Sequence, residues 1–483
     1  MSKIDSTSLA TLRNSLSHSA TVNLPGDREY SVKRWARNAE KPAALVGCPA
    51  TNEDVVQLVT FVQGKAPYES QQKLHLAVKG GGHTPSGASS SDGGLVIDLQ
   101  PHMNNVRVDP EAKLAYVQGG ALWGDVDKAT FPYGLASVSG VVSHTGVGGL
   151  TLGGGFGWLC GQHGLVADNL IQATIVTSTG DILTANDSEN KELYWALRGG
   201  GGNFGVVTEF VLKLHEQRAD LYSSALIFPP PLIERLVLEL NAWLKERSPL
   251  ENAHIIFALG PNGQPGVIMQ LIYNGDSDEG AAKFERFVKL GPVVNRSETL
   301  PYMRLNTLQD ANTDHGDFRI LQGNYIPVAP EGLPIQLVTH AFNAWLKFVT
   351  ENPAASTSIS LIELYHHVKW SSVPSDATAY VQRNPTYNME YLLHWKDPSF
   401  TERAYQALRA LDQEFVKSRD ESIGRGVTGQ GGYTNYLDEE SRTAGVAWLQ
   451  RRFGSNYARL IEVKQKFDPT ALFGRWFVET KDF

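Results

Sequence analysis

One short stretch of the sequence combines a flexible backbone with a reactive side chain. Gly80, Gly81 and Gly82 follow an apolar run that predicts a strand, and His83 comes directly after them. Glycines lack Cβ atoms, so successive backbone N–H groups can form a concave site that suits a diphosphate. A histidine just past such a loop indicates a cofactor whose reactive part lies near the imidazole. A tight turn that carries a surface histidine explains this stretch equally well.

Two further segments are dense in glycine. Residues 139–164 read SGVVSHTGVGGLTLGGGFGWLCGQHG, and residues 198–205 read RGGGGNFG. So many glycines in one span predict neither a regular helix nor a regular strand. Val142, Leu150 and Phe156 make the longer segment too apolar for a flexible linker. We therefore expect it to form a bed for a flat aromatic ring system.

Length and composition limit the class of protein. The chain has 483 residues, which predicts two domains, with a third not excluded. Its net charge of -8 argues against a nucleic-acid partner. No apolar run is long enough to span a bilayer, and the first 18 residues lack the apolar core of a secretory signal. Cys48 and Cys160 form neither a disulfide framework nor a metal site. We expect a soluble, intracellular protein.

The elements that must position these residues follow two patterns. In the first half, short apolar strands alternate with helical segments, and Thr51 to Asp54 form a capping box before a helix. After residue 215 the glycine clusters largely stop, and Asn262-Gly263 predicts a hairpin. An antiparallel sheet covered by helices is expected there. The predicted helices are 230–245, 281–288, 335–349 and 400–416, and the predicted strands are 255–259, 267–273, 358–365 and 389–394.

Taken together, these motifs resemble a known family. The chain is similar to the FAD-linked oxidoreductases of the vanillyl-alcohol oxidase superfamily, which have a p-cresol-methylhydroxylase-type FAD domain, and most of all to the berberine-bridge-enzyme-like branch. The matching segments are KGGGHTPSG (79–87), GVGGLTLGGGFGWL (146–159), GLVADN (164–169), ALRGGGGNFGVVTEF (196–210), YTNYLDEE (433–440) and FGSNYARLIEVKQKFDPTALF (453–473). The resemblance implies an α+β fold in which residues 1–215 and 431–483 form the FAD domain and residues 216–430 form an inserted substrate domain.

The resemblance also implies how FAD is held. His83 is expected to carry a covalent bond to the flavin 8α-methyl carbon. Many members have a second link through a cysteine, but Val142 stands at that position, so a single bond is predicted. Lys79 replaces the more usual arginine and loses its planar fork. No metal is expected. The residues implied to bind FAD are Lys79, Gly80, Gly81, Gly82, His83, Thr84, Gly87, Val142, Ser143, Gly146, Gly149, Gly153, Gly205, Val207 and Asn435.

Four side chains are candidates for the chemistry. In the family the segment of Tyr433 and Tyr436 lies beside the flavin, and either phenol could take a proton from the substrate; both could equally be packing residues. A tyrosine base working at pH 7 needs its pKa lowered by about three units, or roughly 4 kcal/mol. The substrate domain offers Arg383 and Tyr387 within residues 379–394, where Pro385 predicts two short strands or an edge.

Three histidines are ambiguous in the sequence. His366 and His367 are adjacent, so on a strand they would face opposite sides and at most one could reach a pocket. His144 lies close to the predicted flavin bed, where a structural role and a catalytic role are equally compatible with the sequence.

The function implied by the resemblance is an oxidase. It would transfer a hydride from a C–H bond of an alcohol, a sugar or a secondary metabolite to covalently bound flavin, and O2 would reoxidise the flavin to give H2O2. The alternatives are a dehydrogenase that reacts poorly with O2, and a flavoprotein that catalyses oxidative cyclisation or holds a non-redox flavin. The expected partners are a small-molecule substrate and O2, and the chain is expected to be a monomer.

Overall fold

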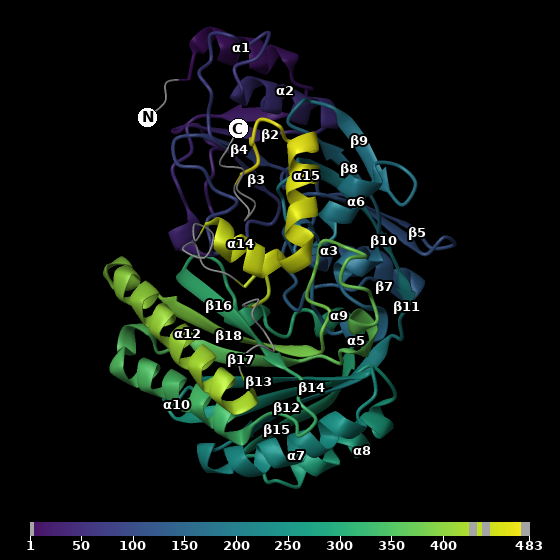
Figure 1. Ribbon diagram of the computed structural model, residues 1–483, viewed down its shortest axis with the longest axis vertical. Helices are drawn as coiled ribbons and strands as arrows, with labels where there is room; N and C mark the ends of the chain where they lie inside the picture. Colours follow the sequence, from purple (N-terminus) through teal and green to yellow (C-terminus); the bar gives the residue numbers. More distant parts are fainter. Residues whose placement is uncertain (1–3, 425–431, 437–444, 475–483) are drawn as a thin grey trace.

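The computed structural model describes residues 4–424, 432–436 and 445–474 (Figure 1). Within these residues, helices and strands build one part of the molecule around two smaller sheets and another part around one large sheet. This arrangement of mixed helices and antiparallel sheets confirms the predicted α+β class. No helix in the described part of the chain is long and apolar enough to cross a membrane.

The first half of the chain forms the two smaller sheets. One has the order β1-β2-β4-β3, and in it β4 runs parallel to both β2 and β3. The other has the order β5-β6-β10-β8-β9 and is antiparallel. The strands are β1 Thr21–Asn23, β2 Leu45–Cys48, β3 Leu76–Lys79, β4 Leu95–Asp98, β5 Val106–Asp109, β6 Leu114–Gln118, β8 Leu170–Val176, β9 Ile182–Asn186 and β10 Val206–Lys213. A two-stranded pair joins β7 Leu135–Ala136 to β11 His215–Glu216.

Helices of the first half cover these sheets. The helices are α1 Ser6–Ser15, α2 Asn52–Val62, α3 Trp123–Thr130, α4 Val147–Leu152, α5 Cys160–His163 and α6 Lys191–Leu197. The predicted capping box of α2 is confirmed, because the Thr51 side chain accepts from the Asp54 backbone N–H and Asp54 bonds back. Helices α4 and α5 show that the glycine-dense segment is not wholly irregular, so that prediction was wrong for ten of its residues.

The large sheet has seven antiparallel strands in the order β15-β12-β14-β13-β17-β18-β16. The predicted hairpin at Asn262-Gly263 is confirmed between β13 and β14. The strands are β12 Asp220–Phe228, β13 Glu251–Leu259, β14 Pro265–Tyr273, β15 Val294–Pro301, β16 Phe318–Pro327, β17 Ile359–Leu364 and β18 Thr386–Trp395. The helices of this region are α7 Ile233–Glu246, α8 Ser277–Val288, α9 Tyr302–Leu305, α10 Ile335–Glu351, α11 Val368–Ser371 and α12 Thr401–Ile423.

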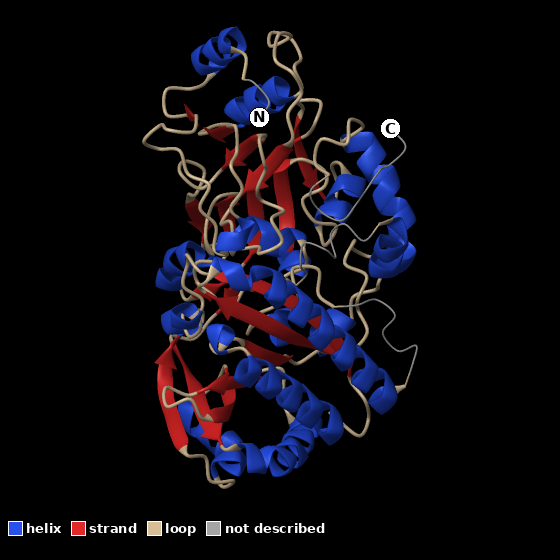
Figure 2. Ribbon diagram, turned by 90° about the vertical axis from the view of Figure 1, so that its left-hand side faces the viewer, coloured by secondary structure: helices blue, strands red, loops and turns tan. Residues whose placement is uncertain are grey.

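The two faces of the large sheet have different surroundings. Helices α7, α8, α10 and α12 cover one face, as Figures 1 and 2 show, and alternate strand residues such as Phe257 and Met389 form a core with them. The intervening residues, among them His254, Glu363 and Glu390, point away from these helices. The sheet therefore presents a partly polar face to the first half of the chain.

The end of the chain returns to the first half. Helix α15, Tyr457–Phe467, packs beside α6, and α14, Val446–Phe453, precedes it (Figure 1). Lys464 of α15 is fully buried and donates to the carbonyl oxygen of Asn203 across 2.6 Å. This return places the segment 432–436 between the two parts of the molecule.

Candidate active site

A cavity of about 260 Å³ lies between the glycine-rich segments and the uncovered face of the large sheet. Its polar lining side chains come from both halves of the chain. They are His83, Thr84, Ser86, Ser89, Thr145, His254, Gln309, Thr313, Glu363, Glu390, Tyr433, Thr434, Asn435 and Tyr436. His83 and Tyr436, which are 353 positions apart in the sequence, therefore border one cavity.

His83 is held in that cavity with one ring nitrogen free. Trp35 stacks on its imidazole, with ring centroids 4.3 Å apart and planes 9° apart, and His144 lies 5.0 Å away. The Nε2 atom of His83 is buried and has no hydrogen-bond partner among the residues that the structure describes. Burial, together with the nearby His144, His315 and Arg319, lowers the pKa of His83 well below its usual value. His83 is therefore a neutral imidazole with an unshared nucleophilic nitrogen.

The glycines around His83 are required by close backbone approach. A Cβ atom on Gly81 would lie 2.5 Å from the backbone nitrogen of Gly146, so the two glycine-rich segments touch along their main chains. At Gly153 an added Cβ would lie 2.6 Å from the side-chain carbon of Asn435. The orphaned His83 nitrogen and this glycine-lined space fit a flat, phosphate-bearing cofactor such as FAD.

Two buried carboxyl groups occupy the opposite wall. Glu363 accepts hydrogen bonds from Tyr436 Oη at 3.0 Å, Tyr365 Oη at 3.1 Å and Asn388 Nδ2 at 2.8 Å. Glu390, on the neighbouring strand, also lines the cavity, and its carboxyl group makes no hydrogen bond or ion pair with the described residues. Burial raises the pKa of both groups, and the charge of Glu363 raises the pKa of Glu390 further. Two carboxyl groups with raised pKa values therefore lie side by side on this wall.

The pKa shifts of the two predicted tyrosines run against a phenolate base. Burial, then the charges of Glu363 and Glu390, raise the pKa of Tyr436 well above its usual value. Burial also raises the pKa of Tyr433, whose hydroxyl accepts from Gly155 N at 2.8 Å and from Asn435 Nδ2 at 2.7 Å. Both tyrosines line the cavity, as expected. Each phenol is placed to donate or accept a hydrogen bond, while the carboxyl groups are the better proton acceptors.

A third polar group extends this wall. His254 pairs directly with Glu363 across β13 and β17, and its Nε2 lies 2.9 Å from Tyr365 Oη. Because Tyr365 donates to Glu363, the hydrogen bonds assign the proton of His254 to Nε2, which leaves Nδ1 as an acceptor. Burial lowers the pKa of His254 to about 3. The imidazole stacks on Trp158 at 4.1 Å and is neutral.

Most residues implied to bind FAD line the cavity, but four do not. Gly80, Gly81, Gly82, His83, Thr84, Val142, Gly146, Gly149, Gly205, Val207 and Asn435 are on its wall. Lys79 instead forms a buried ion pair with Asp98, with Nζ 2.9 Å from Oδ2. This ion pair holds the end of β3, from which the glycine loop begins. Ser143 points at Asp310, to which its backbone and hydroxyl donate. Gly87 lies in the next turn and Gly153 packs behind Asn435.

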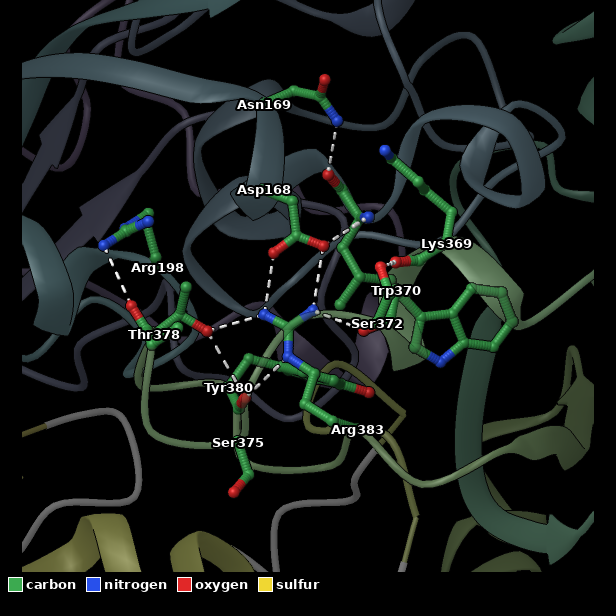
Figure 3. A network of polar contacts seen from close by, with 12 residues as sticks. Asp168, Asn169, Arg198, Lys369, Trp370, Ser372, Ser375, Thr378, Tyr380 and Arg383 are labelled. Carbon is green, nitrogen blue, oxygen red and sulfur yellow. Dashed lines mark hydrogen bonds and ion pairs between the residues drawn. The ribbon is translucent and has the colours of Figure 1, made fainter.

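The prediction that Arg383 and Tyr387 face the flavin is corrected by the strand register. Residues 386–395 form the single strand β18, which is interior to the sheet and begins directly after Pro385. Tyr387 falls on the helix-covered face, beneath Arg247. Arg383 precedes the strand and forms a buried two-pronged ion pair with Asp168, at 2.8 and 2.9 Å, as Figure 3 shows.

The histidine predictions are also corrected in part. His366 and His367 follow the end of β17, with His367 at the start of α11, so they are not on a strand and the argument from alternation fails. His144 contacts His83 and lies 3.3 Å from the Thr313 hydroxyl. Trp35, His254, Glu363 and Glu390 were not singled out from the sequence.

A signal for the two glutamates does exist in the sequence. Residues 359–364 and 386–395 are strands rich in apolar and aromatic residues, with Ser360, Thr386, Asn388 and His394 as their other polar residues, and such a run predicts burial of a carboxylate within it. A buried carboxylate needs a partner or a function, because its desolvation is costly. The alternation of β18 puts Glu390 on the same face as Leu392 and opposite to Tyr387.

Comparison with known proteins also indicates that this chain binds FAD. Family models described as "FAD binding domain" and "Berberine and berberine like" match residues 42–186 and 432–475. An FAD-linked oxidoreductase of Aspergillus terreus is 32% identical, over 96% of this chain and 94% of its own length. The (R)-6-hydroxynicotine oxidase of Paenarthrobacter nicotinovorans is 28% identical, over 96% of this chain and 97% of its own. The solved 6-hydroxy-D-nicotine oxidase of Arthrobacter nicotinovorans superposes with a TM-score of 0.82 at 25% identity, over 95% of this chain and 98% of that one.

Proposed function

This chain belongs to the FAD-linked oxidoreductases of the berberine-bridge-enzyme-like family, and from that premise we propose that it is an oxidase acting on a C–H bond of a small molecule. The substrate classes considered are alcohols, sugars and secondary metabolites. FAD, when bound, supplies the acceptor for the hydride, and O2 takes the electrons on to H2O2. The observation that carries the proposal is a single cavity bordered by the unpartnered His83 Nε2 and by two buried carboxyl groups.

We assign FAD binding to a domain made of residues 1–215 and 431–483, which borders one end of the cavity. We propose that His83 Nε2 holds the flavin covalently, since a neutral, buried imidazole with no hydrogen-bond partner is an available nucleophile. Val142 on the same wall cannot form a second link, so one covalent bond is proposed. The backbone of Gly80 to Gly82 suits the diphosphate, and residues 216–430 are assigned to the substrate.

The substrate end performs the proton chemistry. Glu390 is the proposed base, because its carboxyl group faces the cavity without a hydrogen bond from the described residues. Glu363 and Tyr436 orient the substrate's polar group by their shared hydrogen bond. Apolar side chains of Ile256, Leu361 and Leu392 on the same face exclude water, which strengthens these interactions.

Anaerobic mixing of the yellow holoenzyme with a panel of alcohols, sugars and secondary metabolites tests the proposal. An oxidase is expected to lose its flavin absorbance with at least one compound and to release H2O2 when O2 is admitted. Bleaching followed by reoxidation no faster than that of free flavin would identify a dehydrogenase. Product formed without any bleaching would instead indicate a non-redox flavin, and would contradict the proposal.

A further inference from the structure

A second, much smaller cavity of about 10 Å³ lies next to the active-site cavity, and Thr434 lines both. Its other polar lining residues in the described part of the chain are Tyr325 of β16, Tyr380 and Gln382 of the loop before β18, and Arg452 of α14. Three segments that are far apart in the sequence therefore meet around this cavity. A cavity of roughly 10–15 Å³ holds about one water-sized occupant.

The guanidinium of Arg452 is largely without partners. The residue is only 6% exposed, and its Nη1 and Nη2 atoms are buried with no hydrogen-bond partner among the described residues. Its Nε donates to Thr434 Oγ1 across 3.2 Å. Guanidinium nitrogens are donors and never acceptors, so both Nη atoms need an acceptor that the described residues do not provide.

The positive charge of Arg452 also lacks a counter-charge. The described residues that line this cavity include no aspartate and no glutamate. Burial lowers the pKa of Arg452, and the described groups that oppose this shift are tyrosine phenols rather than carboxylates. Asp168, a buried acid of the same region, is already paired with Arg383, whose guanidinium lies 5.2 Å from the ring centroid of Tyr380 (Figure 3). A buried cation without a counter-charge is costly, and a bound anion would remove that cost.

Two tyrosine hydroxyls add a further donor to the cavity. Tyr325 Oη and Tyr380 Oη lie 3.0 Å apart and share one hydrogen bond, and both residues are buried. Because one hydroxyl donates to the other, the second keeps its own hydrogen for another acceptor. A buried cation and a phenol O–H thus line the same small space, and charge-assisted hydrogen bonds to an anion are stronger than those to a neutral group.

We propose that this cavity binds one small monovalent anion of the size of chloride, held by the Nη atoms of Arg452 and by a hydroxyl of the Tyr325–Tyr380 pair. A water molecule could accept the same hydrogen bonds, but it would leave the charge of Arg452 unbalanced. Phosphate and sulfate are disfavoured because the volume suits a single atom.

The anion would hold together a part of the chain that borders the active site. Arg452 is bonded to Thr434, and Thr434 lies between Tyr433 and Asn435, which both line the active-site cavity. A ligand that binds the folded chain and not the unfolded chain stabilises the fold by mass action. Chloride is therefore expected to raise the unfolding temperature of the protein.

Bromide is the probe for the position of the site. Crystals of the holoenzyme soaked in sodium bromide, with diffraction data collected at the bromine absorption edge, are expected to show an anomalous peak between the Arg452 guanidinium and the Tyr325 and Tyr380 hydroxyls. The experiment needs neither a variant nor turnover, so its outcome is independent of the proposed oxidase activity.

Chloride is the probe in solution. Replacing sodium gluconate, whose anion is too large for the cavity, by sodium chloride at constant ionic strength should raise the unfolding temperature of the wild type by at least about 2 °C. Arg452→Met should lose this shift, and Arg452→Lys should keep part of it because the charge remains. Arg451→Met removes an exposed charge from the adjacent position of α14 and should keep the full shift. Flavin content verifies the fold of each variant.

Three results would overturn the inference. The first is a site that holds water and no bromide. The second is a bromide peak without any effect of chloride in solution, which would mean an adventitious ion only. The third is the same chloride shift in wild type and in Arg452→Met, which would place the effect elsewhere on the protein. If Arg452→Met does not fold, the bromide peak and the comparison of wild type with Arg452→Lys decide the question.

Discussion

The phenol of Tyr436 donates a hydrogen bond to the carboxyl group of Glu363 across 3.0 Å, although the two residues are 73 positions apart. The backbone N–H of Gly323 also donates to the carbonyl oxygen of Tyr436 at 2.7 Å, which fixes the tyrosine against the large sheet. A hydrogen bond to a carboxylate stabilises its ionised form and so opposes the effect of burial on the pKa of Glu363. Tyr436 thereby tunes an acid on the opposite wall.

Tyr436→Phe tests this relationship. Without the phenol the pKa of Glu363 is expected to rise further, so the flavin should be reduced about tenfold more slowly at pH 7, with the pH profile displaced to higher pH. Stopped-flow absorbance over a pH series, with a compound that reduces the flavin, measures both. Tyr391→Phe is the matched control, since Tyr391 Oη is buried on the other face of the sheet and bonds to none of the described residues. An unchanged pH profile in Tyr436→Phe would contradict the tuning role.

The proposed single covalent bond between His83 and the flavin predicts what remains attached to the protein after denaturation. Wild-type protein should keep its yellow colour and its flavin fluorescence on a denaturing gel, and the flavin should map to the peptide that contains His83. His83→Ala should lose the fluorescent band, whereas His102→Ala, at an exposed position, should keep it. Val142→Cys should add a second bond, which peptide mass spectrometry would detect. A retained band in His83→Ala would show that another residue carries the flavin.

The sequence predicted the flavin side of the site better than the substrate side. Glycine positions are restricted by backbone approach, as between Gly81 and Gly146, and such restrictions are local and leave a recognisable motif. The strands 358–365 and 389–394 were also placed within a few residues, because apolar runs bounded by turn residues are a local signal. Eleven of the fifteen residues implied to bind FAD line the cavity.

The substrate side depends on strand register, which local patterns do not specify. Tyr387 and Glu390 differ by three positions on β18 and therefore face opposite sides, but which side faces the cavity is decided by the helices α10 and α12. Arg383 lies outside the strand and finds its partner, Asp168, 215 positions away. The sequence alone does not distinguish a charged residue that is buried and paired with a distant residue from one that faces a ligand.

Arg383 and Asp168 are expected to matter for stability. Arg383→Met leaves the buried carboxylate of Asp168 unpaired, and Asp168→Asn leaves the buried guanidinium of Arg383 without its counter-charge. Each single variant should lower the free energy of unfolding by about 3–5 kcal/mol. The double variant should lose less than the sum, because the pair is removed together. Urea unfolding measures these values. Rates of flavin reduction in variants that remain folded should stay within about threefold of wild type; a large loss of rate with unchanged stability would restore a role for Arg383 in the chemistry.

The raised pKa of Asp127 predicts how the stability of the protein depends on pH. Asp127 lies in α3, its Oδ2 accepts from Asn306 Nδ2 at 2.8 Å, and its Oδ1 has no hydrogen-bond partner in the described part of the chain. Burial raises the pKa of Asp127 from 3.8 to about 7. Below about pH 4 both folded and unfolded chains hold the proton. Between pH 4 and 7 only the folded chain holds it, so rising pH favours unfolding, and the contribution of Asp127 falls by about 4 kcal/mol before levelling off.

Asp127→Asn removes this titration while keeping the shape of the side chain. The variant is expected to be more stable than wild type at pH 8 by up to about 4 kcal/mol, and closer to wild type at pH 5. Urea unfolding of both proteins at the two pH values measures the difference. Asp187→Asn, at an exposed position, controls for the loss of one negative charge and should follow wild type. If Asp127→Asn were less stable than wild type at pH 8, Asp127 would have to be ionised in the folded protein and held by a group that compensates its charge.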